Sequence, residues 1–357
     1  MFRSVFKFIL LIFLSVFIAV SGASAQQSKW YKGNTHVHTT LSGHADTTPD
    51  EVAKWYLDRD YNFLILSEHN KFIDPETINL PEGRREDFIL IPGEEVTDDD
   101  HVVHSTAMNI EDLVPWNKDA NSSVTQAIQF HVDATHDHGG TTILNHPNFE
   151  YAIRTGDILG THDLYMFELY NGHNAVNNYG DEKHISTEVM WDSLLSQGMK
   201  IYGVSSDDAH QFQVMSPNVS NPGRGWVMVK ADELSSEAMT EAMLKGDFYS
   251  TSGVLLKSIK SSSNHYAVTV DPEKTAEALK STVLRGKYVK DGKAGFRIEY
   301  IGPEGEILST TYNESAKYSV SEPMTYLRVK ITYTRAISEG GFEEYYAWGQ
   351  PVFDAEP

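Results

Sequence analysis

Short apolar runs alternate with helix-like stretches from Lys29 to about Gly246, and this alternation most constrains what the chain can fold into. The apolar runs have the length and composition of buried strands. They occupy residues 63–66, 88–91, 141–144, 166–169, 201–204 and 226–229. A chain that repeats strand and helix in this way is expected to form a parallel sheet, and at this length a closed βα barrel is the natural architecture.

Helix start and stop signals lie between the apolar runs. Thr48 can cap a helix over residues 51–59, because Pro49 suits the first helical position and Glu51 completes a capping box. Ser123 can cap a second helix over residues 124–138, which ends at two glycines. Two more helices are predicted over residues 185–197 and 235–245, each followed by a glycine that can end it.

The pattern changes after about Thr251. Residues 266–270, 296–300 and 326–333 alternate polar and apolar side chains, with turn signals at residues 302–303 and 340–341. We therefore expect an α/β fold in two parts, a βα barrel over residues 26–253 and a small antiparallel β-sandwich-like domain over residues 254–357. The aromatic-rich segment 345–351 is predicted to be a strand packed on the barrel.

The first 25 residues have the layout of a secretory signal peptide. Arg3 and Lys7 precede a 13-residue apolar run at residues 8–20, and the small residues 23–25 follow it. The run is short for a bilayer span of about 20 residues, so we expect cleavage after Ala25 and no stable membrane anchor afterwards. No cysteine stands at the junction, which excludes a bacterial lipid-anchored form. The pattern predicts export, to a bacterial periplasm.

Composition excludes several classes of protein. The chain has 29 Lys and Arg against 50 Asp and Glu, a formal charge of −21, and loss of Arg3 and Lys7 would leave 27 against 50, or −23. Such a surface repels phosphate backbones, so nucleic acid is not an expected partner. The absence of cysteine rules out disulfides, thiol nucleophiles and thiolate metal sites, and it suits an oxidising compartment.

The distribution of histidine along this chain is unusual, because 14 of its 15 histidines lie between His36 and His210. Many of them follow predicted strands, where a βα barrel places its active site. His36 and His38 alternate with Val37, so in an extended segment both rings point the same way. The other strand-end groups are Ser67-Glu68-His69, Glu94-Glu95 with His101 and His104, Asn145-His146-Pro147, and Asp207-Asp208-Ala209-His210. Histidines and carboxylates without cysteine suit Zn, Mn or Fe.

Other histidines are expected to be ordinary surface or structural residues. This group comprises His131, His136, His138, His162 and His184. His173 follows a predicted strand, and its role stays open at this point.

Taken in order, these motifs resemble the PHP (polymerase and histidinol phosphatase) family of metal-dependent phosphoesterases. The order is His-x-His, Ser-x-His, Gly-x-Glu, Asn-His-Pro and Asp-x-His, and the resemblance runs from Lys29 to Gly253. It includes a last trace at residues 246–253, which is similar to the closing segment of stand-alone bacterial members. Membership implies a distorted seven-stranded βα barrel that holds two or three divalent metal ions.

The resemblance also implies a role for each matching residue. His36, His38 and Asp208 correspond to the ligands of a first metal, His104 and His146 to ligands of a second, and His44, His69 and His210 to those of a third. Glu95 corresponds to the bridging carboxylate that is central to catalysis. His101 is an alternative to His104, and Asp46 is an alternative to His44. The chain departs from the family at Glu68, where an aspartate is usual, and at Ser42-Gly43, where many members have Asp-Gly after the serine.

These ligands predict hydrolysis of a small phosphorylated substrate by metal-activated hydroxide. The metal ions reconcile an anionic substrate with an acidic protein, since they invert the charge at the site. Arg224, within residues 221–225 and just before a strand, is a candidate second phosphate anchor. Two alternatives remain open: hydrolysis of a non-phosphate ester or amide at the same metals, and a non-catalytic secreted binding module.

Overall fold

The structure is a computed structural model that describes residues 28–116 and 122–357. The predicted signal peptide, residues 1–25, lies outside the described residues. Within the described ranges, every helix is too short or too polar to cross a bilayer.

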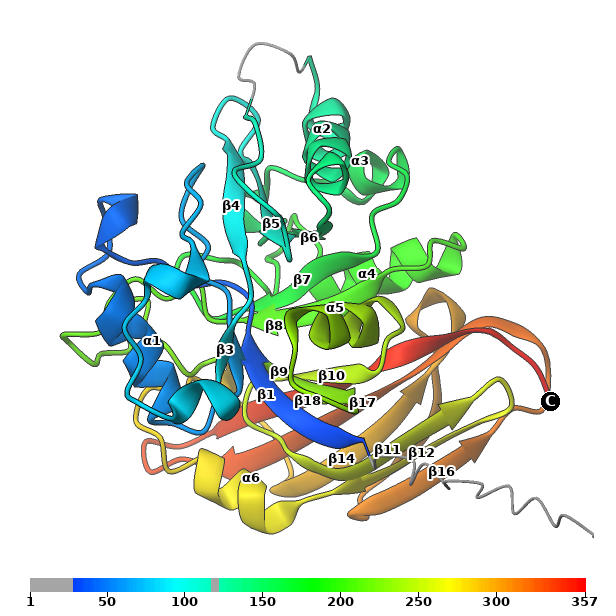
Figure 1. The fold of residues 1–357 in the computed structure, drawn as a ribbon. Coiled ribbons are helices and arrows are strands. Elements are labelled where there is room, and N and C mark those ends of the chain that lie inside the picture. The colour runs from blue at the N-terminus through cyan, green and yellow to red at the C-terminus, as the bar shows by residue number, and fades with distance from the viewer. Residues whose placement is uncertain (1–27, 117–121) are drawn as a thin grey trace, which may run out of the picture.

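The described residues form a mixed α/β fold in which strands outnumber helices (Figure 1). The strands of the first half are β1 (Lys29–Asn34), β2 (Phe63–Leu64), β3 (Ile89–Leu90), β4 (Gly93–Asp98), β5 (Val103–Met108), β6 (Thr141–Leu144), β7 (Met166–Asn171), β8 (Tyr202–Ser206), β9 (Trp226–Ala231) and β10 (Phe248–Thr251). Those of the second half are β11 (Leu256–Ser262), β12 (His265–Val270), β13 (Lys287–Val289), β14 (Gly295–Ile301), β15 (Ile307–Thr311), β16 (Ser315–Ser319), β17 (Met324–Ala336) and β18 (Phe342–Ala355). The helices are α1 (Pro49–Leu57), α2 (Val124–Asp137), α3 (Thr155–Leu159), α4 (Thr187–Ser196), α5 (Ser236–Leu244) and α6 (Pro272–Ala278).

The strands that precede the site residues are divided between two sheets. In one sheet β1, β2 and β3 pair in parallel, and β9 and β10 continue it antiparallel on the other side of β1. The second sheet runs β4-β5-β6-β7-β8, with parallel pairing only from β6 to β8. Two isolated parallel bridges, Val37 to Ala209 and His69 to Glu95, join residues from the ends of the two sheets. The chain therefore brings strand ends from both sheets to one place.

All six apolar runs contain strands, but the sheets are less parallel than the strand–helix alternation predicts. Residues 93–108 form the antiparallel pair β4 and β5, a hairpin that the sequence pattern does not reveal. Its strands carry Glu95 and His104, which were expected to lie in a loop after a strand. The correction matters for the site, because a hairpin holds these two side chains on a paired backbone.

The predicted caps explain where the helices begin. Thr48 and Glu51 form the capping box of α1, and Pro49 occupies its first turn. The side chain of Ser123 accepts a hydrogen bond from the backbone N–H of Gln126 at the start of α2. Each helix buries one face. In α1 this face comprises Val52, Ala53, Tyr56 and Leu57, which pack with Phe88 and Trp226 in one apolar cluster.

Helix α4 is tied to strand β17 by charged side chains. Arg328 on β17 donates from Nε and Nη2 to the two carboxylate oxygens of Asp192, at 2.7 Å each. Beside this pair, Lys330 Nζ lies 2.6 Å from Oε2 of Glu188. Burial opposes ionisation of Glu188, but Lys330 and Arg328 lower its pKa to about 2. These contacts connect the first half of the chain to its C-terminal strands.

The C-terminal strands extend the sheet of β1 to β3. Strands β17 and β18 form a long hairpin that turns at Gly340 and Gly341, whose φ values of 88° and 89° favour glycine. Strand β18 then pairs with β10, so the ten-stranded sheet runs without a break from one half of the chain to the other. Strands β11, β12 and β16 form a separate sheet, and Tyr266 and Val268 of β12 pack in one cluster with Leu327 and Val329 of β17.

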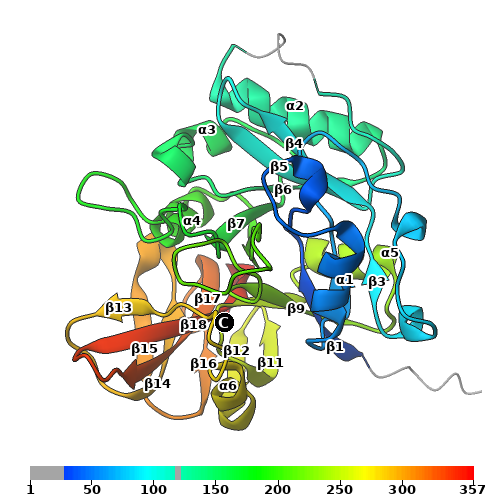
Figure 2. The same ribbon diagram turned by 90° about the vertical axis from the view of Figure 1, so that its left-hand side faces the viewer.

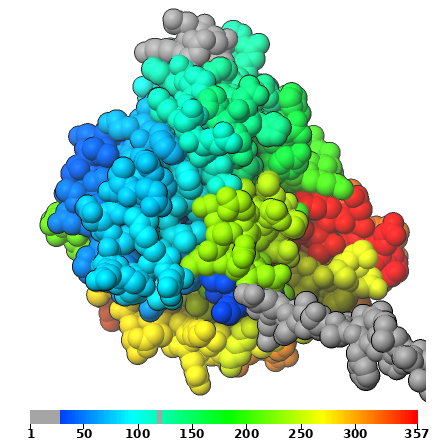
Figure 3. Space-filling model, viewed as in Figure 1, coloured from blue at the N-terminus to red at the C-terminus, as the bar shows by residue number. Residues whose placement is uncertain are grey.

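The figures show where these parts lie. In Figure 1, α2 and α3 lie at the upper end of the molecule beyond β5 and β6, and the C-terminal strands form the lower part. In the turned view, β14, β15, β17 and β18 gather on one side, while α1, β1 and β3 lie on the other (Figure 2). The space-filling view shows the C-terminal residues, yellow to red, along the lower and right-hand parts of this face (Figure 3).

Candidate metal centre

His36 and His38 supply the first two imidazole rings of the site. They follow β1 in an extended segment, in which Val37 makes the bridge to Ala209. Because side chains alternate along such a segment, both rings point into the same space, with their Nε2 atoms 3.1 Å apart. Both residues are buried. Two buried imidazole nitrogens that converge on one point form a natural chelate for a cation.

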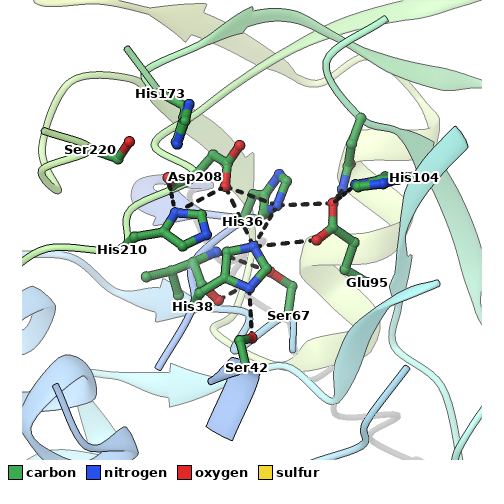
Figure 4. Close-up of polar contacts among 12 residues, drawn as sticks. His36, His38, Ser42, Ser67, Glu95, His104, His173, Asp208, His210 and Ser220 are labelled. Atoms are coloured by element: carbon green, nitrogen blue, oxygen red, sulfur yellow. Dashed lines mark hydrogen bonds and ion pairs between the residues drawn. The ribbon is translucent and has the colours of Figure 1, made fainter. Parts of the chain in front are cut away.

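Glu95 on β4 contacts several rings of the cluster, and in Figure 4 it faces His36 and His38 from one side. Its Oε1 is 3.2 Å from Nε2 of His36, and its Oε2 is 3.3 Å from Nε2 of His38 and 2.9 Å from Nδ1 of His69. The isolated bridge between His69 and Glu95 places the end of the β2 segment beside β4. The carboxylate thus presents each of its oxygens to a different set of rings.

Asp208 and His146 join the cluster in strained backbone conformations. Their φ values are +48° and +23°, in the region that residues with a side chain rarely adopt. Asp208 Oδ1 lies 3.4 Å from Nε2 of both His36 and His38, and Nε2 of His146 lies 3.3 Å from Oε1 of Glu95. Such strain persists where the surroundings hold it, often at functional sites.

The three remaining predicted ligands complete the pocket. The ring of His44 stacks on that of His69 with centroids 5.1 Å apart, and the ring of His210 stacks on that of His38 at 4.4 Å. Nδ1 of His104 lies 3.4 Å from Oε1 of Glu95. In Figure 4, Glu95 and His104 face His36 from one side, and Asp208 and His210 from the other.

The two alternatives to these ligands lie elsewhere. Asp46 accepts hydrogen bonds from the backbone N–H groups of Phe212 and Gln213, at 2.9 and 3.2 Å. His101 pairs with Asp98, with Nδ1 3.2 Å from Oδ2. Neither Asp46 nor His101 lines the pocket, whereas His44 and His104 do.

Four groups of three ligand atoms could each hold a metal ion. Within each group the atoms lie within 4.8 Å of one another, and the groups are His38, His69 and His210; His36, His146 and Asp208; His36, His38 and Glu95; and His69, Glu95 and His104. They contain every predicted ligand except His44, which lines the pocket beside them. Several residues belong to two groups, as expected where metal ions share ligands.

The unsatisfied polar atoms of the cluster fit a metal ion. Oε2 of Glu95 and Nδ1 of His104 are buried without a well-aligned hydrogen bond, although charged partners lie within 3.4 Å. Buried polar atoms are normally hydrogen-bonded, and an atom that is not needs an explanation such as an absent ion. The histidine and carboxylate donors suit a borderline divalent cation.

A surrounding layer of hydrogen bonds orients the rings. Nδ1 of His38 lies 3.0 Å from the hydroxyl of Ser42, which in turn donates to Glu68. Nδ1 of His69 lies 2.7 Å from the hydroxyl of Thr97. Glu68 therefore supports His38 indirectly, and it also accepts a hydrogen bond from the backbone N–H of Thr39 at 2.8 Å. Such partners hold ligands in the orientation that metal binding requires.

Glu168 is the site residue that sequence reasoning missed. It lies on β7, within the run that the sequence identified only as a buried strand. Its Oε1 is 2.8 Å from Nδ1 of His36, and its Oε2 accepts from the backbone N–H of His146 at 2.7 Å and from Nδ2 of Asn171 at 2.8 Å. A single carboxylate inside an apolar strand was the available signal, because a buried charge without partners is costly.

Charges within the cluster shift one another's pKa values. Burial alone would raise the pKa of Glu95, but the rings of His36 and His69 hold it well below its ordinary value. The pKa of Asp208 is lowered in the same way against burial, by His36 and His38. Burial favours neutral His38, yet Asp208 and Glu95 raise its pKa to about 9. Both carboxylates are thus ionised at neutral pH, and they favour the protonated form of His38.

The pocket above the cluster measures about 320 Å³. It is lined by His38, His44, His69, Glu95, His104, His146, Phe149, His173, Asp208, His210 and Gln211. No lysine or arginine is among these described lining residues. The structure thus brings His173, left open by the sequence, to the pocket, whereas His131 is buried against Ser105, with 3.1 Å between Nδ1 and the hydroxyl.

Arg224 is not brought to the pocket. Its side chain is buried, and its guanidinium donates to the backbone carbonyls of Val283, Gly172 and Ser216, at 3.0, 3.2 and 2.9 Å. Donors already used by backbone carbonyls are not free for a phosphate. The residue acts as a support for the loops around the site instead of the phosphate anchor that its sequence position suggested.

Together these residues define a candidate polynuclear metal centre of the histidine–carboxylate type. No protein-family model and no curated protein matches the chain. A search of solved structures finds a two-domain protein from Bacteroides vulgatus that contains a predicted PHP-like metal-dependent phosphoesterase. The match has a TM-score of 0.45 and 12% sequence identity, and it covers 89% of this chain and 95% of that one.

Proposed function

We propose that this protein is a metal-dependent phosphoesterase that hydrolyses a small phosphorylated substrate. The observation that carries the proposal is the convergence of Glu95, Asp208 and six histidines, from distant segments of the chain, into overlapping groups that could hold metal ions. The order of these residues along the chain is the order that resembles the PHP family. Packing eight ionisable side chains together is costly without a cation, so their convergence from distant segments favours a metal-binding role.

In this proposal two or three divalent ions, of Zn, Mn or Fe, are held by the chain. His36, His38 and Asp208 hold one ion, His104 and His146 a second, and His44, His69 and His210 a third, with Glu95 shared between ions. When bound, such ions supply a hydroxide nucleophile at neutral pH and neutralise charge on the phosphoryl oxygens.

The chain's own side chains contribute positioning and exclusion of water. Glu168 fixes the ring of His36 by a contact to Nδ1, so that Nε2 faces the centre. Ser42 does the same for His38. Phe149 packs beside His146, with ring centroids 5.5 Å apart, and gives the pocket an apolar wall. An apolar wall excludes water and lowers the local dielectric constant, so it strengthens the electrostatic interactions that stabilise charge during the reaction.

The proposal extends to the setting of the site. Seven of the strands from β1 to β9 would form the distorted barrel, and the bridges at Val37 and His69 support it by joining the two sheets. The β domain of residues 254–357 would follow the barrel. The signal-like sequence of residues 1–25 supports export to the periplasm, with cleavage after Ala25.

Metal analysis and a substrate panel test the proposal. We expect two to three equivalents of metal after loading with Zn or Mn, by elemental analysis, and hydrolysis of p-nitrophenyl phosphate or bis-p-nitrophenyl phosphate. Less than one equivalent of bound metal would contradict any enzymatic function at this site and favour a binding module. Hydrolysis of p-nitrophenyl acetate alone would show an esterase in place of a phosphoesterase.

A further inference from the structure

Two polar residues of the pocket are left over once the metal ligands are set aside. The lining residues that are not predicted ligands are Phe149, His173 and Gln211. The described lining contains no cationic side chain, and Arg224 is used by backbone carbonyls. An anionic substrate therefore has only neutral donors of the protein to bind, in addition to the metal ions.

The tautomer of His173 follows from one hydrogen bond. The backbone N–H of Ala175 donates to Nδ1 of His173 at 3.1 Å. A backbone N–H can only donate, so Nδ1 is an acceptor and the ring proton of the neutral imidazole lies on Nε2. A ring in this state offers an N–H donor, and it has no free lone pair on Nε2 for a metal ion.

The Nε2–H donor of His173 is directed toward the candidate metal ligands. The ring of His173 meets the ring of His210 edge-on, with centroids 5.3 Å apart. In Figure 4 the ring points toward Asp208 and His210 without an interaction drawn to either. Within residues 28–116 and 122–357, His173 belongs to none of the metal-binding groups, and its Nε2 has no hydrogen-bond partner.

Hydrogen bonds among neighbouring site residues hold the backbone of His173 in place. The backbone N–H of His173 donates to Oδ1 of Asn171 at 2.8 Å, and Nδ2 of Asn171 donates to Oδ2 of Asp208 at 3.2 Å. The carbonyl of Gly172 accepts from Nη1 of Arg224 at 3.2 Å. A Cβ at Gly172 would lie 2.8 Å from Cβ of Arg224, so this close approach requires glycine. Arg224 thus positions the turn that presents His173.

We propose that His173 is a substrate-binding residue that donates a hydrogen bond from Nε2 to a phosphoryl oxygen of the substrate. Gln211, which lines the same pocket, supports His173 in binding the anion. The backbone N–H of Ser220 donates to Oε1 of Gln211 at 2.9 Å, which leaves the amide NH₂ of Gln211 as a second neutral donor. This inference rests on the proposed function, and it assigns to His173 the anion contact that the sequence suggested for Arg224.

The test compares His173→Ala with His173→Gln, since glutamine can place an N–H close to the position of Nε2. The control is His162→Ala, an exposed histidine outside the pocket. Each metal-loaded protein is measured for metal content, for affinity toward inorganic phosphate by calorimetry, and for kcat/KM on p-nitrophenyl phosphate. We expect His173→Ala to keep its metal, to bind phosphate about tenfold more weakly, and to lose about 10- to 100-fold in kcat/KM. His173→Gln should recover much of both losses, and His162→Ala should match the wild type.

Three outcomes would overturn the inference. Loss of metal in His173→Ala would make the residue a ligand. Phosphate affinity equal to that of the wild type would show that the donor does not reach the anion. If the wild type itself neither binds phosphate nor hydrolyses the ester, the proposed function fails and the inference fails with it, and that result is distinct from an active wild type with a silent variant.

Discussion

At the scale of single residues, His36 shows how the site is built. Its Nε2 faces Glu95 and Asp208, at 3.2 and 3.4 Å, and its Nδ1 faces Glu168 at 2.8 Å. Glu168 fixes which nitrogen of the ring is protonated, and therefore which lone pair is available to a metal ion. The strand that carries Glu168 thus supports the candidate metal centre, although it supplies no residue of the four groups that could hold a metal ion.

Replacement of Glu168 should weaken metal binding without removing a ligand. In Glu168→Gln the amide would present its NH₂ either to His36 or to the backbone N–H of His146, and both positions need an acceptor. We expect an affinity for Zn or Mn about 10- to 100-fold lower, measured by competition with a chelator. Glu182→Gln, on an exposed loop, is the control. An affinity equal to that of the wild type would show that Glu168 does not orient the ligand.

Metal binding should release protons from the cluster. Asp208 and Glu95 raise the pKa of His38 to about 9 against the effect of burial, so below that pH the metal-free ring is mostly protonated. A metal ligand must be neutral imidazole, so His38 loses its proton when it binds, and the apparent affinity increases with pH up to about 9. Calorimetry at pH 7 in two buffers with different ionisation enthalpies measures this release. An observed enthalpy that does not depend on the buffer would contradict it.

At the scale of elements, the packing of α4 on β17 depends on charge. Glu188 on α4 contacts Lys330 and Arg328 on β17, and its pKa falls to about 2 in the fold from an ordinary value of 4.5. A carboxyl group with a lowered pKa stabilises the folded state above its ordinary pKa, and this contribution is lost as the pH falls from 4.5 toward 2.

Glu188→Gln should therefore destabilise the protein in a pH-dependent way. We expect a free energy of unfolding about 1–3 kcal/mol lower than that of the wild type at pH 7, from urea titrations. The difference should shrink below pH 4.5 and vanish only below pH 2, where the wild-type carboxyl is also mostly neutral. A difference that stays constant over this range would mean that the side chain acts through packing alone.

The hairpin of β4 and β5 is the element that the sequence pattern concealed. Glu95 pairs with Thr106 across it, and Thr97 pairs with His104, so both ligands belong to one paired unit. The residues of this segment are mostly buried and include many charged and polar side chains. Neither strand shows the apolar run of a core strand, and Glu95 and Thr97 of β4 and His104 of β5 face the site.

At the scale of the whole molecule, the ten-stranded sheet joins the two predicted domains. Strand β18 pairs with β10, and Trp348 of β18 lies in one apolar cluster with Tyr170 of β7 and Trp191 of α4. Shared backbone pairing and a shared apolar cluster make the two halves stabilise each other. We therefore expect one cooperative unfolding transition in calorimetry, although the sequence divides near residue 253.

Trp348→Ala tests this coupling. Trp348 is 3% exposed, and its truncation should lower the free energy of unfolding by about 3–5 kcal/mol while the transition stays single. Tyr312→Ala, a side chain that is 56% exposed, is the matched control. Two separate transitions, with only the second shifted by the substitution, would show that the C-terminal strands form an independent domain.

The local pattern of the sequence was enough to predict most strands and helices, and it pointed to the candidate ligands. Apolar runs, the capping box at Thr48 and the alternation of His36 with His38 are properties of neighbouring residues, so they can be read before folding. Eight of the nine predicted metal ligands lie in the metal-binding groups, and His44 lies beside them in the same pocket.

Only the tertiary structure decided which side chains meet. It placed His44 and His104 in the pocket in preference to Asp46 and His101, added Glu168, and buried Arg224 among backbone carbonyls. Each of these outcomes depends on the pairing of segments far apart in the chain, such as the 132 residues between His36 and Glu168. Local propensity carries no information about such distances. The sequence therefore determined the chemistry of the candidate ligands, and the tertiary fold determined their geometry, because the paired strands and the loops that follow them bring donor atoms from distant segments within reach of one another.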